Sequence, residues 1–307
     1  MAAMNWSQLL NQVYADAIPT LGRGEVATYI PALAAVPAQR FGIALVTVEG
    51  DLAAVGHAHE PFSIQSISKV FSLAMALRDG GDALWQRCGR EPSGNSFNSL
   101  VQLEREHGIP RNPFINAGAL VVADLLAKRR INARADLLKF MRNRVGSERL
   151  YYDERVAASE AATGARNRAL AWFIKSFGNI EGNVDEVLDL YFHQCALAMS
   201  CVDLARAACF LANEGVDPFT EERVLNPLQT RRINSLMLTC GTYDAAGEVA
   251  FQVGLPAKSG VGGGILAIVP RKLAIVAWSP RLDTHGNSVA SLAALRAFVD
   301  RSGLTVF

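Results

Sequence analysis

Residues 62–77 read Phe-Ser-Ile-Gln-Ser-Ile-Ser-Lys-Val-Phe-Ser-Leu-Ala-Met-Ala-Leu, and the fold expected of this chain follows from them. Apolar residues recur at positions 67, 70, 71, 74 and 77, which is the spacing of an α-helix with a buried face. Leu73 and Met75 widen that face, so the sequence predicts a helix over 66–79 that is buried on most sides. Arg78 and the glycines at 80 and 81 predict its end.

Ser66 and Lys69 lie three residues apart in this apolar segment, so they share a helix face. Burial disfavours a charged ammonium, and a neutral amine beside a hydroxyl can accept its proton and create a nucleophile. Ser-x-x-Lys is the arrangement of serine acyl-transfer enzymes such as β-lactamases and penicillin-binding proteins. One such pair can arise by chance, and the alternative is a helix-start serine followed by a lysine that extends to solvent.

Composition limits the class of protein. With 307 residues, half of them hydrophobic, we expect one large domain or two intimately packed ones. Charged residues make up 19%, which indicates extensive burial, partly in an oligomer, and the net charge of +1 gives no indication of nucleic acid or an anionic membrane as partner. Five cysteines without a CxxC pair indicate reduced thiols and a cytoplasmic location. No signal peptide or transmembrane segment is expected.

Strand patterns occur near both chain ends. Residues 41–48 and 52–57 predict one hairpin, 264–269 and 273–278 predict another, and the alternation over 249–255 predicts a further strand. Helical patterns fill 84–242, and the helices expected there are 97–107, 117–130, 133–144, 153–158, 166–177, 183–199, 201–213 and 227–239. The pattern predicts an α+β fold of one domain, 1–307. Its sheet-containing subdomain comprises 1–82 and 243–307, and 83–242 form an inserted all-helical subdomain.

Short turns between successive strands imply antiparallel pairing. We therefore expect one antiparallel sheet built from both chain ends, with terminal helices over 5–17 and 287–301 on one face. The 66–79 helix and the helical block would cover the other face. The start of the 66–79 helix would then lie at the boundary between sheet and helical block, where a cleft is expected.

The segment Lys258-Ser259-Gly260, inside the glycine-rich run 256–264, resembles the Lys-Thr-Gly element of Ser-x-x-Lys enzymes. There a glycine-lined strand lets the substrate approach, and a backbone N–H points at the developing oxyanion. A plain glycine-rich turn is the alternative. The Ser-Asp-Asn element of β-lactamases is missing, so that interpretation is incomplete. His57 and His59 have no third ligand at zinc-like spacing, and we expect no metal site.

Taken together, the motifs resemble the serine-dependent glutaminase family, whose fold is β-lactamase-like. The matching segments occur in the family's order and, with Tyr29, extend over most of the chain, as in the short bacterial form of the family. They are residues 65–69, 91–94, 97–99, 111–119, 159–160, 166–168, 191–195, 240–248 and 256–264. The resemblance implies hydrolysis of L-glutamine to L-glutamate and ammonia without a metal or an organic cofactor. It also suggests a homodimer or a homotetramer.

The resemblance further implies which residues perform the reaction. Ser66 would be the nucleophile and Lys69 its general base, and the backbone N–H groups of Ser66 and Val261 would form the oxyanion hole. Tyr191 and Tyr243 would relay protons to Lys69 or to the leaving ammonia, because ammonia leaves only when it is protonated.

Other residues would hold the free amino acid. The resemblance implies that Glu160 binds the substrate ammonium, that Asn116, Asn167 and Tyr29 bind the α-carboxylate and neighbouring atoms, and that Gln65 flanks the nucleophile. Without the resemblance, Asn116 could be only a helix cap and Glu160 only a surface acid. Two other functions stay open: a different Ser-x-x-Lys enzyme such as an esterase, peptidase or β-lactamase, and an amino-acid-binding protein without catalysis.

Overall fold

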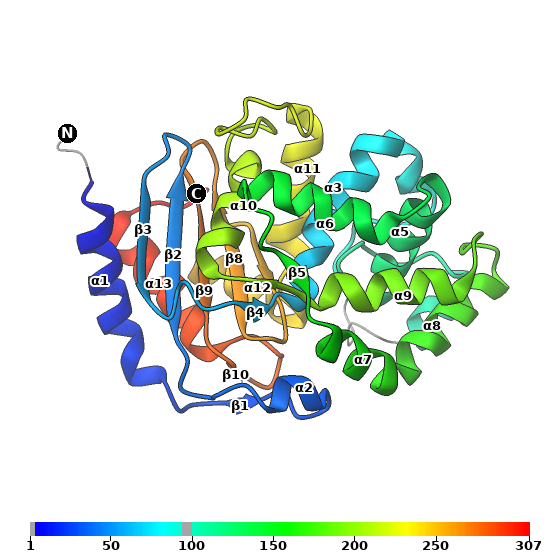
Figure 1. Ribbon diagram of the computed structural model, residues 1–307, viewed down its shortest axis with the longest axis horizontal. Helices are drawn as coiled ribbons and strands as arrows, with labels where there is room; N and C mark the ends of the chain where they lie inside the picture. The colour runs from blue at the N-terminus through cyan, green and yellow to red at the C-terminus, as the bar shows by residue number, and fades with distance from the viewer. Residues whose placement is uncertain (1–3, 94–99) are drawn as a thin grey trace.

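Five antiparallel strands from the two ends of the chain form the central sheet, in the order β3-β2-β9-β8-β7 (Figure 1). The computed structural model describes residues 4–93 and 100–307. The strands are β2 (Gly42–Thr47), β3 (Leu52–Gly56), β7 (Ala257–Ser259), β8 (Gly264–Val269) and β9 (Leu273–Trp278). The two predicted hairpins are confirmed, and β2 pairs with β9 to join them into one sheet.

Alternation along the strands sends apolar side chains to both faces of the sheet. From β2, Ile43 and Leu45 join the hydrophobic cluster under the terminal helices α1 (Trp6–Ala17) and α13 (Val289–Ser302). Ala44 and Val46 join the larger cluster on the opposite face, which contains α10 (Cys201–Ala212) and α3 (Ser68–Gly80). Figure 1 shows this arrangement, with the helical block on the side away from α1. The predicted α+β fold is confirmed.

Helix α3 runs through the core, as its apolar sequence predicts. A short strand β4 (Phe62–Ser63) and a single 3₁₀ turn η2 (Gln65–Ile67) precede it, and every residue from 68 to 77 is buried. The helix ends at Gly81, whose positive φ of 57° suits a residue without a side chain. Ser66 therefore lies in the turn that leads into α3, and Lys69 lies in the first turn of the helix.

The helical block follows the predicted order. It comprises η3 (Gly81–Gln86), α4 (Leu100–Arg105), α5 (Asn116–Arg129), α6 (Ala133–Val145), α7 (Glu154–Thr163), α8 (Ala165–Ser176), α9 (Val184–Cys195), α10 and α11 (Pro227–Cys240). The first residues of the helix expected over 97–107, and the motif positions 94 and 97–99, lie outside the described residues. Smaller elements complete the chain: η1 (Ile18–Thr20), β1 (Glu25–Val26), α2 (Pro31–Ala34), η4 (Tyr243–Ala245) and β10 (Arg281–Leu282).

The helix expected over 183–199 is too long. Helix α9 ends at Cys195, and β6 (Leu197–Met199) follows it as the central strand of a small sheet between β4 and β5 (Tyr151–Tyr152). The apolar run 195–199 fits a helix and a buried strand equally well, and only the two partner strands decide between them. The small sheet therefore joins β4, which precedes Ser66, to the end of α9.

The strand expected over 249–255 is also wrong, because the chain forms α12 (Ala246–Gln252) there. Val249 and Val253 are four residues apart as well as alternating, so both can face the cluster under α13. Phe251, which a strand would have buried, is 89% exposed. The glycine-rich segment 256–264 thus follows a helix. Within the described residues, no helix has the length and apolar character needed to cross a membrane.

Candidate active site

A cavity of about 420 Å³ opens between the sheet and the helical block, beside the start of α3. Nine of the residues expected at the site line it: Tyr29, Gln65, Ser66, Asn116, Glu160, Asn167, Tyr191, Tyr243 and Val261. Lys69 lies behind this lining, where it is 1% exposed. Segments far apart in the sequence therefore meet around Ser66.

Ser66 follows a strained residue. Gln65 has a φ of 51°, an uncommon conformation for a residue with a side chain, and it turns the chain sharply before the helix. The amide of Gln65 donates to Ser63 Oγ (2.9 Å), and that hydroxyl donates to the carbonyl oxygen of Cys195 (2.7 Å). This chain of hydrogen bonds fixes the turn to the end of α9, so Ser66 is held at the cavity wall.

Lys69 is a buried amine held by two oxygen atoms. Its Nζ donates to Asn116 Oδ1 (2.7 Å) and to the carbonyl oxygen of Phe114 (3.2 Å). Burial lowers the pKa of Lys69 from 10.5 to about 8, and the nearby Cys195 and Glu160 oppose this shift. A large fraction of the amine is therefore neutral in mildly alkaline solution, in the state that can accept a proton.

The glycine-rich segment packs directly on the turn that carries Ser66. A side chain at Gly260 would place its Cβ 2.5 Å from the carbonyl oxygen of Ile64, so this close approach requires glycine. The backbone N–H groups of Ser66 and Val261 have no hydrogen-bond acceptor among the described residues. Two backbone donors are thus available beside the cavity, as an oxyanion site requires.

Two tyrosines lie beside the Ser66–Lys69 pair, and Tyr191 is buried while Tyr243 is half-buried. Tyr243 interacts with Ser66 and donates from its hydroxyl to the carbonyl oxygen of Ser259 (3.3 Å). The ring of Tyr191 lies with its centroid 5.7 Å from Lys69 Nζ. Burial raises the pKa of both phenols above the ordinary value of 10, so each keeps its proton and can donate it.

The residues expected to hold a free amino acid also meet at the cavity. Glu160 is 6% exposed, and burial raises its pKa from 4.5 to about 7, although a hydrogen bond with Gln65 and the charge of Lys69 oppose the shift. Asn116 donates to Asn167 Oδ1 (3.0 Å) while its own oxygen accepts from Lys69, so it links Lys69 to Asn167 on α8. Tyr29 lies at the rim and is 58% exposed.

The structure adds residues that sequence reasoning missed. Cys195 and the exposed Arg166 line the cavity together with Ile30, Thr163 and Gly164. Lys258 lies fully buried beneath Tyr243, with its Nζ 4.8 Å from the centroid of that ring. The only sequence signal for Lys258 was its place in the Lys-Ser-Gly segment. In the described part of the chain, no group of three or more His, Cys, Asp or Glu side chains could hold a metal ion.

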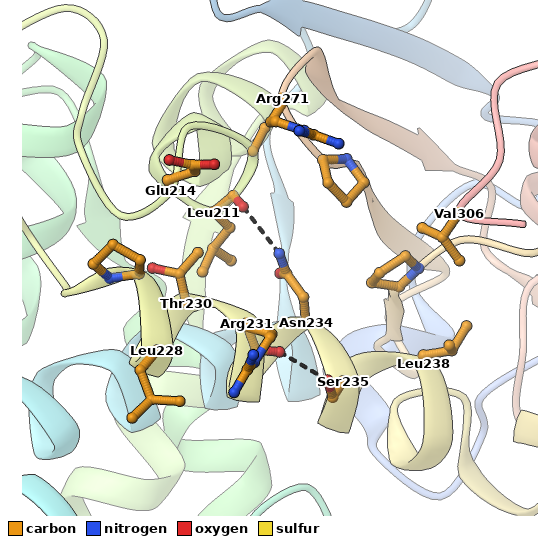
Figure 2. Close-up of a pocket in the computed structure, with 14 residues that line it drawn as sticks. Leu211, Glu214, Leu228, Thr230, Arg231, Asn234, Ser235, Leu238, Arg271 and Val306 are labelled. Carbon is orange, nitrogen blue, oxygen red and sulfur yellow. Dashed lines mark hydrogen bonds between the residues drawn. The ribbon is translucent and has the colours of Figure 1, made fainter.

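A larger cavity of about 590 Å³ lies elsewhere, beside α11 (Figure 2). It contains none of the expected site residues. Its polar groups bond locally: Asn234 Nδ2 donates to the carbonyl oxygen of Leu211 (3.0 Å), and Ser235 Oγ donates to that of Arg231 (2.9 Å). We assign the reaction to the smaller cavity, because size alone does not supply a nucleophile and a base.

Comparison with known proteins gives one matching family model and relatives over nearly the whole chain. Residues 24–307 match the family model described as Glutaminase. A glutaminase of Paraburkholderia phytofirmans is 54% identical over 304 residues, which cover 99% of this chain and 100% of the relative. The solved structure of the probable glutaminase ybaS is 37% identical, with a TM-score of 0.93 over 98% of this chain and 97% of that one.

A third relative is the Bacillus subtilis glutaminase YbgJ, solved as a covalent complex with 5-oxo-L-norleucine. It is 33% identical, with a TM-score of 0.87, and the match covers 99% of this chain and 100% of that one. The family model and the relatives span nearly the whole chain, and the fold is the β-lactamase-like one expected. The chain therefore belongs to the glutaminase family.

Proposed function

We propose that this protein is an amidohydrolase that converts L-glutamine and water to L-glutamate and ammonia through an acyl-enzyme on Ser66. The observation that carries the proposal is the position of Ser66 at a cavity wall, three residues before a buried lysine whose pKa is about 8. The covalent complex of the Bacillus subtilis relative supports it. The ligand there carries its carbonyl at the carbon where glutamine carries its amide carbonyl.

The first half of the reaction forms an ester. Neutral Lys69 accepts the Ser66 hydroxyl proton while Oγ attacks the side-chain amide carbon of glutamine. The amide oxygen becomes an oxyanion that accepts hydrogen bonds from the backbone N–H groups of Ser66 and Val261. The C–N bond then breaks as the nitrogen receives a proton from Tyr243 or Tyr191, which Lys69 replaces. Ammonia leaves, and the glutamyl group stays on Ser66.

The second half hydrolyses the ester. Lys69 accepts a proton from water, and the resulting hydroxide attacks the acyl carbon through the same oxyanion site. The bond to Ser66 Oγ breaks, and the proton returns to Oγ. Both halves use one base and one pair of backbone donors, so no metal or organic cofactor is required.

The substrate would be recognised by groups at fixed positions in the cavity that complement its two charges. A free amino acid presents one ammonium and one carboxylate. The Glu160 carboxylate would pair with the ammonium, and the amides of Asn116 and Asn167, with Tyr29 at the rim, would bind the carboxylate. Ionisation of the buried Glu160 is favoured when a cation arrives, since an opposite charge lowers the pKa of a carboxyl.

The test is ammonia release from L-glutamine by the wild type beside Ser66→Ala. We expect robust release by the wild type and none by the variant. Faster turnover of nitrocefin or p-nitrophenyl acetate than of glutamine would favour a different Ser-x-x-Lys enzyme. Bound glutamine without ammonia release would identify a binding protein instead.

We also propose the wider setting of the enzyme. Five buried free cysteines support a reducing cytoplasmic environment. The exposed aromatic side chains of Phe251 and Phe307, which are 89% and 83% exposed, support association of copies into a homodimer or homotetramer. The central sheet, whose strands all lie in 42–56 and 257–278, supports the division into a sheet-containing subdomain (1–82 and 243–307) and a mainly helical one (83–242). The second subdomain is not all-helical as expected, because it contains β5 and β6. Light scattering would determine the oligomeric state.

A further inference from the structure

The turn of residues 283–287 joins β10 to α13, and the proposed mechanism gives it no task. Its own hydrogen bonds hold it. Asp283 Oδ1 accepts from the backbone N–H groups of His285 and Asn287 (both 2.9 Å), and the backbone N–H of Asp283 donates to the carbonyl oxygen of Asn287 (2.8 Å). Gly286 has a φ of 88°, which permits the tight turn. The turn is therefore rigid enough to support its neighbours.

Asn287 is the buried end of this turn and is 0% exposed. Its Oδ1 accepts from the hydroxyl of Ser259 (2.6 Å), and its Nδ2 donates to the carbonyl oxygen of Thr242 (3.2 Å). A carbonyl oxygen can only accept, so the nitrogen of the amide must face Thr242. Burying an amide costs free energy unless its donor and its acceptor are paired, and Asn287 pairs both. Asn287 thereby links β7 to the residue before Tyr243.

The same turn also contacts Tyr243 and the residue after it. A Cβ added to Gly286 would lie 3.6 Å from Cε2 of Tyr243, so the turn packs against the tyrosine ring. His285 Nδ1 lies 3.2 Å from Asp244 Oδ1 at the surface, where both side chains are about half exposed. The turn therefore holds the residues on both sides of Tyr243.

The backbone conformation of Tyr243 requires such support. Its φ is 60°, which is unfavourable for an aromatic residue and persists only where neighbours impose it. The contact between His285 and Asp244 is exposed to water, so it contributes little. The bond from Asn287 is buried and fixes the peptide plane that joins Thr242 to Tyr243. It therefore acts directly on the strained dihedral angle.

We propose that Asn287 is a positioning residue that holds the backbone of Tyr243 in place, so that the phenol stays beside Ser66. The inference rests on the proposed function, in which Tyr243 can deliver a proton to the leaving ammonia. Asn287 is not among the described residues that line the cavity, and it would not contact glutamine. Its loss should therefore slow the chemical step and leave substrate binding nearly unchanged.

The experiment is a double-mutant cycle between Asn287→Leu and Tyr243→Phe, with kcat and KM measured by ammonia release. Leucine has nearly the shape of asparagine and makes neither hydrogen bond. We expect Asn287→Leu to lower kcat roughly 10- to 30-fold and to change KM less than about threefold, because a displaced proton donor loses most of its effect. In the Tyr243→Phe background, the same change should cost less than about twofold.

Asn287→Asp distinguishes the two hydrogen bonds of this side chain. At about pH 9 the new carboxyl group is ionised, so it can accept from Ser259 but cannot donate to Thr242. We expect kcat to fall as it does in Asn287→Leu, because the bond to Thr242 is the one that acts on Tyr243. Asn11→Leu changes an exposed asparagine on α1 and should leave kcat unchanged.

Several results would overturn this inference. They are wild-type kcat in Asn287→Leu, in Asn287→Asp or in Tyr243→Phe, a KM that rises as much as kcat falls, and a double variant whose losses multiply, which is what general structural damage produces. If Asn287→Leu does not fold, Asn287→Asp takes its place in the cycle. Ser66→Ala separates the two levels, because activity in that variant defeats the mechanism itself.

Discussion

Replacing Glu160 with glutamine should shift the pH dependence of this enzyme towards acid while weakening substrate binding. The charge of Glu160 holds the pKa of Lys69 up, against the larger effect of burial, which lowers it to about 8. Glutamine has nearly the same shape as glutamate and no charge. In Glu160→Gln, burial acts on Lys69 with less opposition, so the pKa of Lys69 falls below its wild-type value.

The magnitude follows from the fraction of neutral lysine. With a pKa of about 8, half of Lys69 is neutral at pH 8 and roughly one tenth at pH 7, since each pH unit below the pKa reduces the neutral fraction about tenfold. Glu160, with a pKa of about 7, must also lose its proton to bind the ammonium. Wild-type kcat/KM should therefore rise with pH through 7 and 8 and fall on acidification.

In Glu160→Gln, only the Lys69 ionisation limits kcat/KM on the acid side. We expect its midpoint to move down by roughly one pH unit, as for loss of one nearby opposite charge. The lost ionic hydrogen bond should raise KM about 10- to 100-fold, which corresponds to about 1.5–3 kcal/mol.

The assay is ammonia release at limiting glutamine from pH 6 to pH 9, because kcat/KM reports ionisations of the free enzyme. Glu154→Gln is the matched control, since it removes an acid that is 73% exposed from the same helix, α7. It should leave the midpoint in place, because water and salt screen an exposed charge. A midpoint in Glu160→Gln at or above the wild-type value would refute the reasoning.

Three further changes test other parts of the structure. Gly260→Ala places a Cβ 2.5 Å from the Ile64 carbonyl oxygen and should lower kcat about 10- to 100-fold, whereas Gly247→Ala, with open space around it, should not. Arg166→Gln removes an exposed cation at the rim of the cavity, so steady-state kinetics should show KM raised about two- to fivefold at low salt. The increase should be smaller at high salt, because salt screens an exposed charge. Asp217→Ala removes one of the two carboxylates that hold the buried Arg144, the one 2.8 Å from Nη1, while Glu222 still pairs with Nη2. It should destabilise the fold by about 1–3 kcal/mol in urea unfolding.

The sequence predicted the helices and strands whose apolar residues repeat with one clear period, and it predicted their order along the chain. The buried helix after Ser66 and the two hairpins have patterns that only one secondary structure satisfies. Residues 249–255 do not, because the spacing of Val249 and Val253 fits a strand and a helix alike, and the choice depends on packing against α13. The strand at 197–199 likewise exists only because β4 and β5 lie on either side of it.

The candidate site shows the same division. The family resemblance pointed to Lys69 and to nine of the fourteen residues that line the cavity, and all of these except Tyr29 lie in matching segments. Arg166 and Cys195 lie in segments that match the family, but only the structure shows that they line the cavity and that Lys258 packs beneath Tyr243, because these contacts depend on how β7, α8 and α9 meet in space. Nor does the sequence reveal the positive φ of Tyr243, which the tertiary packing imposes.

The most direct test of the acyl-enzyme on Ser66 is the mass of the protein after incubation with 6-diazo-5-oxo-L-norleucine, the reagent that formed the covalent complex of the Bacillus subtilis relative. The account predicts one added 5-oxo-norleucine group per chain, located on Ser66 by peptide mapping and absent from Ser66→Ala. An adduct of the same mass on Ser66→Ala, or a modified peptide that does not contain Ser66, would contradict it.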